Sequence, residues 1–228
     1  QCFVFIRKAN CRVSIIMSYI LNIHTATEIA IVSIAEDANV LASSINTNQK
    51  DHATFLQPAI KQLLFDCDVL LRQANAIAVT AGPGSYTGLR VVMATAKGLC
   101  YALKIPLIAL STLEVMALSV INSHSTNEEE IYFCPMIDAR RMEIFTAIYD
   151  RALNALLLPC TVIVEKKSFT NLLLKNKIIF FGNGSAKWKQ LCDNENALFC
   201  ELKNNTLYMS ELSFKKYRLP NQFFFLFP

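Results

Sequence analysis

One nine-residue segment, 82–90, constrains the fold of this chain more than any other feature. It reads GPGSYTGLR and lies between a short apolar run, 76–80, and a longer run with helical character, 89–104. Three glycines within seven residues indicate that the backbone has positive φ or approaches other atoms closely. A strand, a glycine-rich turn and a helix leave free N–H groups at the helix N-terminus, which suits an anion. A tight turn without a ligand is the alternative.

Three familiar motifs do not fit this segment. A phosphate loop of the form G-x-x-x-x-G-K-[ST] needs lysine after its last glycine, whereas Leu89 and Arg90 follow Gly88. A nucleophile elbow, G-x-S-x-G, fails because Ser85 follows Gly84 directly. The dinucleotide fingerprint G-x-G-x-x-G fails because Gly88 comes one residue too late. The pattern alone therefore leaves the chemistry open.

The order of expected elements indicates an α/β fold. Three strand-like runs separated by polar turns read as an antiparallel meander, and helices and strands then alternate. This βββαβα order is that of the actin-like ATPase and ribonuclease-H-like fold, with a mixed sheet and helices on its faces. The expected strands are 19–23, 29–34, 40–44, 76–80 and 107–110, and the expected helices lie within 52–65, 89–104 and 112–120. Pro58 should kink the first helix or move its start later.

The polar segment 122–130 is the best candidate for a linker between two lobes. We expect a first lobe at 17–122 and a second, reduced lobe at 131–217, with residues 1–16 as an extension and 218–228 as an atypical tail. In the second lobe we expect strands at 131–137, 143–149, 161–164 and 178–181, a helix near 169–174 and another from Ser185.

Composition excludes some classes of protein. Hydrophobic residues make up 53% of the chain, which supports a substantial core. The net charge of +4 includes three basic residues in 1–16, so the remainder has 19 basic and 18 acidic residues and no general basic excess for binding tRNA alone. None of the 8 cysteines forms a C-x-x-C pair, so we expect reduced thiols and a cytoplasmic protein.

Segments on both sides of the glycine-rich turn resemble the TsaB family, in the same order and from about Met17 to about Lys216. The matching segments are 18–34, 51–64, 82–90, 94–103, 105–114 and 135–150. TsaB proteins are dimerisation subunits of the bacterial complex that makes threonylcarbamoyladenosine beside the tRNA anticodon. The resemblance implies a non-catalytic subunit without a cofactor or metal, paired with a TsaD-like catalytic subunit on which a TsaE-like ATPase docks. It also implies a homodimer when the chain is alone, and contact with tRNA only through the complex.

The expected helix 89–104 has two apolar flanks. Its charged residues Arg90, Lys97 and Lys104 are seven apart and form one narrow stripe. Two apolar flanks suggest burial against the sheet and against a second body, although neighbouring helices of the same chain could cover both. By resemblance, this helix and 52–65 form the subunit contact, and the turn carries the family motif. The expected interface residues are Leu56, Ile60, Leu63, Arg90, Val92, Ala96, Leu99 and Leu103. The motif residues are Gly82, Pro83, Gly84, Ser85, Tyr86, Thr87, Gly88 and Arg90.

Two enzymatic readings remain as alternatives. Actin-like ATPases place an acid after the first strand, and here the matching residue is His24, a poor magnesium ligand. We therefore expect an ordinary hydrogen-bonded histidine and a poor ATPase, with an ATP-dependent phosphotransferase as the alternative. The GNG segment 182–184 is either a remnant of an adenosine loop or a turn. A peptidase is the weaker alternative, because Ser85 would need a histidine and an acid brought together by the fold.

Overall fold

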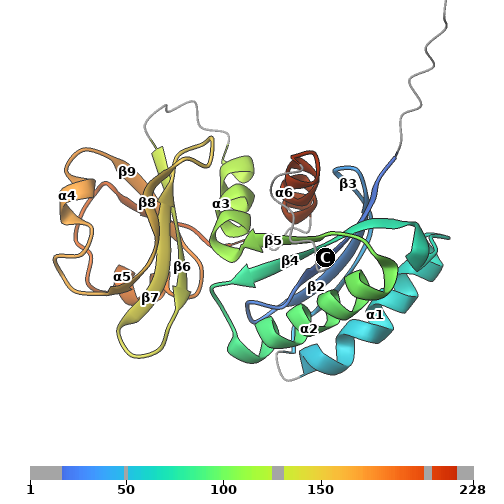
Figure 1. Cartoon of the computed structure of the whole chain (residues 1–228). Coiled ribbons are helices and arrows are strands. Elements are labelled where there is room, and N and C mark those ends of the chain that lie inside the picture. Colours follow the sequence, from blue (N-terminus) through green and yellow to red (C-terminus); the bar gives the residue numbers. More distant parts are fainter. Residues whose placement is uncertain (1–16, 49–50, 125–130, 203–206, 220–228) are drawn as a thin grey trace, which may run out of the picture.

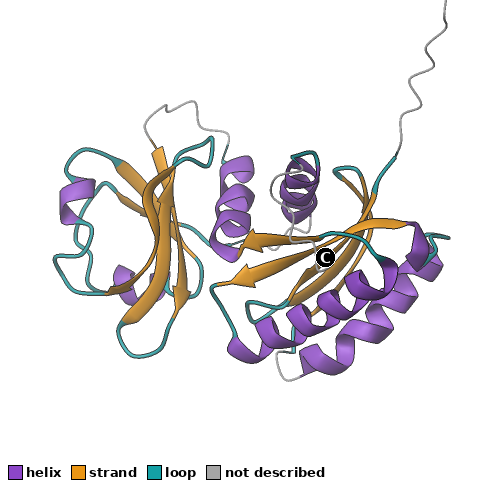
Figure 2. Cartoon of the chain, in the orientation of Figure 1, coloured by secondary structure: helices purple, strands orange, loops and turns teal. Residues whose placement is uncertain are grey.

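Two five-stranded mixed sheets organise the chain, one in each lobe (Figure 1). The computed structural model describes residues 17–48, 51–124, 131–202 and 207–219. The expected extension 1–16, most of the expected linker and nearly all of the expected tail lie outside the described residues. The expected α/β class is confirmed, and helices flank both sheets (Figure 2).

The first sheet has the strand order β3-β2-β1-β4-β5. The first three strands form the predicted antiparallel meander, and β4 and β5 continue the sheet in parallel. Its strands are β1 (Tyr19–His24), β2 (Ala30–Glu36), β3 (Asn39–Asn46), β4 (Ala74–Gly82) and β5 (Leu107–Ser111). Its helices are α1 (His52–Asp66), α2 (Tyr86–Leu103), α3 (Thr112–Ser123) and α6 (Leu207–Tyr217), with a short 3-10 turn at η2 (Leu71–Gln73).

Both faces of the first sheet are buried. Alternate residues of a strand point to opposite faces, so Leu21 and Ile77 pack beneath α1 and α2. Ile20 and Ala78 pack on the other side beneath α3 and α6. Figure 1 shows these two helical layers on either side of the sheet. Burial on both faces explains why the central strands read as nearly continuous apolar runs.

Helix α1 confirms the predicted helical period, and Pro58 does not move its start later. The helix begins at His52 and continues through Pro58, which lies on its exposed side. Proline removes one backbone hydrogen bond at that point, and the apolar residues on the buried side of α1 hold the helix to the sheet regardless. No helix in the described ranges has both the length and the apolar character needed to cross a membrane.

The second sheet has the strand order β10-β9-β6-β7-β8. Helix α3 covers one face, and Leu173 and Trp188 of two short helices pack on the other. Strand β8 begins earlier than predicted, and β10 was not predicted because it has only 3 residues. The strands are β6 (Ile131–Asp138), β7 (Glu143–Tyr149), β8 (Ala155–Ile163), β9 (Lys177–Phe181) and β10 (Ala197–Phe199), and the short helices are α4 (Thr170–Leu173) and α5 (Ser185–Lys189).

Helix α6 corrects the expected lobe boundary. The range 131–217 assigned this segment to the second lobe, but α6 packs against β1, β3 and β5 of the first sheet. Asn22 donates from Nδ2 to Ser210 Oγ at 3.2 Å, and Met209 and Leu212 join the core around Ile20. The first lobe therefore needs a helix from the far end of the chain to cover its second face.

The glycine-rich segment packs tightly against the β1–β2 turn. Ser85 donates its backbone N–H to Ala26 O at 2.7 Å, and Thr25 Oγ1 donates to Gly88 O at 2.8 Å. Gly84 has φ +154°, and a Cβ there would overlap the Ala26 carbonyl. A Cβ on Gly88 would overlap the carbonyl oxygen of Thr25. The predicted need for positive φ and close approach is confirmed.

The two glycines of α2 should respond to alanine in opposite directions. We expect Gly88→Ala to destabilise the chain by about 2 kcal/mol or more, since its methyl group overlaps backbone in a packed interior. Gly98 has open space around its missing Cβ, so Gly98→Ala should stabilise the helix by about 0.5–1 kcal/mol. Urea unfolding of both variants measures this, and equal effects at the two positions would contradict the packing described here.

Candidate functional site

The structure offers two candidate sites, a cleft between the lobes and the outer face of α1 and α2. The cleft contains an open cavity of about 470 Å³ between the β1–β2 turn, the start of α2 and the β6–β7 turn. A second cavity of about 300 Å³ shares Thr27, Glu28, Ile137 and Asn183 with the first. Both lie where two lobes of an α/β protein commonly hold small molecules.

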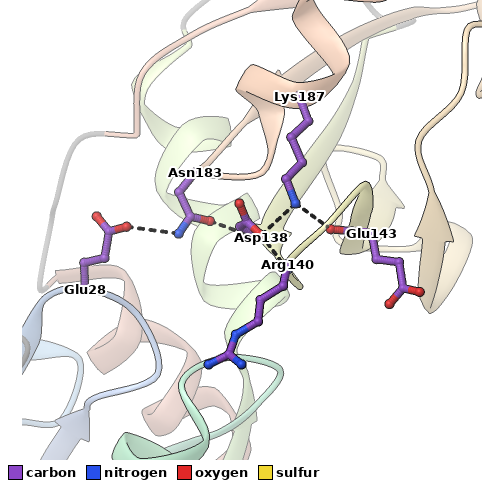
Figure 3. A network of polar contacts seen from close by, with 6 residues as sticks. All are labelled: Glu28, Asp138, Arg140, Glu143, Asn183 and Lys187. Carbon is purple, nitrogen blue, oxygen red and sulfur yellow. Dashed lines mark hydrogen bonds and ion pairs between the residues drawn. The ribbon is translucent and has the colours of Figure 1, made fainter.

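A chain of polar contacts crosses the cleft (Figure 3). Asn183 Nδ2 donates to Glu28 Oε1 at 3.3 Å, which joins the second lobe to the first. Asp138 N donates to Asn183 Oδ1 at 2.9 Å, and Lys187 Nζ donates to Asp138 Oδ1 at 2.7 Å. The hydrogen bond from Lys187 is the main reason that the pKa of Asp138 lies below its usual value. These polar groups already satisfy one another within the chain.

Arg140 is the remaining cation beside the larger cavity. It is exposed on the β6–β7 turn, where Arg140 and Arg141 both have positive φ, at +72° and +46°. Asp138 Oδ1 accepts a hydrogen bond from Arg140 N at 2.6 Å. In Figure 3 the guanidinium points away from Lys187, while Glu28 and Asp138 contribute carboxylates to the same cavity. An anion in the cleft would therefore meet charges of both signs.

His24 confirms the reading of an ordinary hydrogen-bonded histidine. Its Nδ1 lies 3.0 Å from Thr80 Oγ1 and its Nε2 lies 2.9 Å from Thr27 Oγ1, so both ring nitrogens are engaged. Burial, together with a smaller effect of the nearby His52, lowers the pKa of His24 from 6.5 to about 4. The imidazole is therefore neutral at pH 7 and serves as a link between β1, β4 and the β1–β2 turn.

The GNG segment is explained by packing. Gly182 has φ +92°, and a Cβ there would overlap the carbonyl oxygen of Met136. Gly184 N donates to the same oxygen at 3.1 Å, so β6 and the turn after β9 approach backbone to backbone. This geometry supports the turn rather than the remnant of an adenosine loop. Asn183, which the sequence did not single out, supplies the contact with the first lobe.

Ser85 serves as the cap of α2. Its Oγ accepts a hydrogen bond from Gly88 N at 3.3 Å, which satisfies one of the free N–H groups at the helix start. His24 bonds to Thr27 and Thr80 rather than to Ser85, so the arrangement does not form a serine-hydrolase triad. The ranges that the structure describes contain no cluster of three or more histidine, cysteine or acidic residues suited to a metal.

Five of the expected interface residues belong to the chain's own core, which corrects the prediction. The side chains that face the sheet are Leu56, Ile60, Leu63, Val92 and Ala96, each at most 4% exposed. The pattern left open which flank of α2 faces a partner, and the structure shows that the flank with Val92 and Ala96 packs on the sheet. Leu99 and Leu103 are half-buried, and Arg90 is exposed.

The outer surface of these helices, here called the α1/α2 face, is formed by other residues. Phe65 and Tyr101 are 80% and 70% exposed, and Leu70 beyond the end of α1 is 53% exposed. The small residues Ala94, Gly98 and Ala102 are exposed along α2. A groove of about 610 Å³ adjoins this face, lined by Gln57, Ile60, Lys61, Leu64, Phe65, Asp68, Val69, Leu70, Leu71 and Leu99. The run Leu63–Phe65 offered a signal for Phe65, since three successive apolar residues cannot all face the sheet.

Comparisons with known proteins identify the class. A sequence model of the family described as TsaD, tRNA N6-adenosine threonylcarbamoyltransferase, matches residues 39–213. The chain is 34% identical over 131 residues to the tRNA threonylcarbamoyladenosine biosynthesis protein TsaB of Bacillus subtilis, covering 58% of this chain and 55% of that protein. It is 32% identical over 137 residues to the Escherichia coli protein of the same name, and the match covers 60% of this chain and 57% of that protein. The matches thus span little more than half the length of these relatives.

Solved structures show the same fold. A Pseudomonas aeruginosa protein, described as uncharacterized with similarity to the peptidase YeaZ, superposes with a TM-score of 0.76 at 23% identity, covering 92% of this chain and 95% of that one. YeaZ from the same organism superposes with a TM-score of 0.72 at 23% identity, covering 89% of this chain and 93% of that one. The two-lobed α/β architecture of the chain is thus that of these solved structures. Within that class the chain belongs to the family of the matching sequence model, on its TsaB branch.

The burial of His24 predicts acid sensitivity. In the unfolded chain this ring takes up a proton near pH 6.5, whereas in the folded chain it takes up the proton only near pH 4. The stabilisation associated with the neutral ring is therefore complete above pH 6.5 and is lost as the pH falls toward 4. Urea unfolding between pH 4.5 and 8 should show a falling free energy of unfolding, with a flatter profile in His24→Gln.

A second variant, His52→Gln, tests the same argument. Burial also lowers the pKa of His52, so that variant should remove a part of the same pH dependence. An unchanged pH profile in His24→Gln would contradict the assignment.

Proposed function

We propose that this chain is a non-catalytic subunit in tRNA threonylcarbamoyladenosine biosynthesis that pairs through its α1/α2 face with a TsaD-like catalytic subunit. The family and the names of the relatives support the pathway. The observation that carries the pairing is the exposure of Phe65 and Leu70 in a groove, and of Tyr101 on α2, on a helical layer whose other side is well packed.

Large apolar side chains exposed on one helical layer indicate a contact surface. Single exposed apolar residues are normal, but aromatic residues beside a groove are typical of the centre of an interface. Burying a phenylalanine side chain that is now mostly in water contributes about 1.5–3 kcal/mol. The exposed small residues Ala94, Gly98 and Ala102 would let a partner helix approach α2 closely.

The cleft supports a structural role for this subunit. His24 stands where related ATPases carry an acid, and both of its nitrogens are used within the fold. Asn183 bridges to Glu28 of the first lobe, and Asp138 and Lys187 bond to each other within the second lobe instead of presenting free donors. In this proposal threonylcarbamoyl transfer takes place on the partner, a TsaE-like ATPase docks on the pair, and tRNA is reached through the complex.

The cysteines support a cytoplasmic location for this assembly. The described cysteines are free thiols, and burial raises the pKa of Cys100 to about 11 and that of Cys134 to about 12. Such thiols are inert side chains of a core in a reducing compartment.

Two variants should break the pairing without harming the fold. Gly98→Leu adds a good helix former where the folded chain has open space, yet it blocks close approach to α2. Phe65→Glu places a carboxylate at the centre of the patch. We expect each to weaken binding of the TsaD-like subunit from the same organism by at least tenfold in calorimetry, at an unchanged or higher melting temperature.

The control is Leu158→Glu, an equally drastic change at a side chain that is 73% exposed on β8 of the second lobe. It should leave binding unchanged. Wild-type binding by Gly98→Leu and Phe65→Glu would exclude the α1/α2 face as the contact.

A further inference from the structure

Helix α3 is apolar around most of its circumference. A helix at a protein surface needs one apolar stripe, whereas a helix that is apolar on all sides is buried on all sides. Of the 12 residues of α3, 8 are buried. Figure 1 shows this helix between the two sheets. Both sheets therefore use the same helix as a covering layer.

The two sides of α3 belong to different cores. Met116 and Val120 pack in the cluster that contains Phe133 of the second sheet. Leu118 packs on the other side, in the cluster that contains Ile108 of the first sheet. A change in the angle between the sheets would pull α3 away from one of the two clusters and expose close-packed apolar side chains to water.

A turn of the second lobe also reaches both cores. Leu153, between β7 and β8, packs against the clusters on both sides of α3. Its φ of +63° is unusual for leucine, and its backbone N–H donates to Asp150 O at 3.1 Å. In the same turn, Arg151 donates from Nη1 to His124 O at 3.1 Å, at the C-terminal end of α3. The turn therefore fastens the second lobe to α3 at that end.

The contact through Asn183 lies toward the opposite end of α3. Met116, in the first half of the helix, lines the smaller cavity together with Asn183 and Glu28. The hydrogen bond from Asn183 to Glu28, at 3.3 Å, joins the lobes there. Rotation of the second lobe about either attachment would break the other, because the two lie toward different ends of the same helix.

We infer that α3 is a wedge that fixes the angle between the lobes, so that the cleft of this chain does not open and close around a ligand. Hinge closure needs a few backbone positions that absorb the motion between two separately packed bodies. Here the packing itself crosses from one body to the other. This inference goes beyond the proposed function, since it concerns the shape that the chain offers to any partner. It also disfavours the phosphotransferase alternative, because kinases close their lobes around the nucleotide.

Distance measurements test the fixed angle. Spin labels on Ser43→Cys of β3 and Lys175→Cys of the second lobe, both at exposed sites, report the separation of the lobes in pulsed electron paramagnetic resonance. Cys2 and Cys11 are replaced by serine. Burial raises the pKa of the other native thiols, so they react slowly. The parent without the two new cysteines measures the label that native thiols take up.

We expect one narrow distribution of distances, the same with and without magnesium ATP. A broad or two-peaked distribution, or a shift on addition of magnesium ATP, would overturn the wedge.

A charge change at the cleft separates the wedge from the hydrogen bond across the cleft. Asn183→Asp keeps the acceptor for Asp138 N but turns a carboxylate toward Glu28. Asn176→Asp is the matched control, because the Asn176 amide donates within the second lobe, to Leu172 O at 3.0 Å. We expect neither change to widen the distribution. Widening in Asn183→Asp alone would show that one surface hydrogen bond, rather than α3, sets the angle.

Unfolding gives a second readout. Trp188, the single tryptophan, is 1% exposed in the second lobe, and Cys100 is 0% exposed in the core of the first. Because α3 belongs to both cores, tryptophan fluorescence and thiol labelling of Cys100 should give the same urea midpoint. Val92→Ala, on the far side of the first sheet from α3, should lower both midpoints equally, by about 0.5–1 M urea. Separate midpoints, or a shift of the Cys100 midpoint alone, would mean that the lobes are independent and would refute the inference.

Discussion

The backbone contact between the β1–β2 turn and the start of α2 determines where that helix lies. Ser85 is held to Ala26, and Gly88 is held to Thr25, at distances that leave no room for a side chain. Because α2 is fixed to β1 at its first turn, its rotation about its own axis is fixed as well. The side with Val92 then faces the sheet, and the side with Gly98 faces water.

The same contact places α2 between two surfaces, one of which is lined by polar contacts and the other by exposed apolar side chains. The start of α2 forms one wall of the cleft, where short polar contacts join Glu28, Asn183 and Asp138. The rest of α2 forms part of the α1/α2 face, where Phe65 and Tyr101 are exposed. The polar groups of the cleft bond to one another, whereas the α1/α2 face leaves apolar side chains in water. Function is therefore better sought on the outside of the first lobe than between the lobes.

The sequence predicted the fold better than it predicted the contact surface. Strand and helix positions followed from periodicity and from the glycine-rich turn, whose need for small residues the structure confirms. The sequence left open which flank of α2 faces a partner, because both flanks are apolar and only the position of the sheet distinguishes them. Helix α6 was missed because its amphipathic pattern is weak. The link through Asn183 was missed because it joins residues 155 positions apart.

The return of α6 to the first lobe has a consequence for biosynthesis. The chain leaves the first lobe after α3, builds the second sheet, and then comes back to cover Ile20 and Ala78. During translation these side chains stay uncovered on that part of the sheet until α6, at Leu207–Tyr217, has left the ribosome. The N-terminal lobe is thus the first to be made and the last to be finished, and its open apolar surface during that interval is a natural target for chaperones.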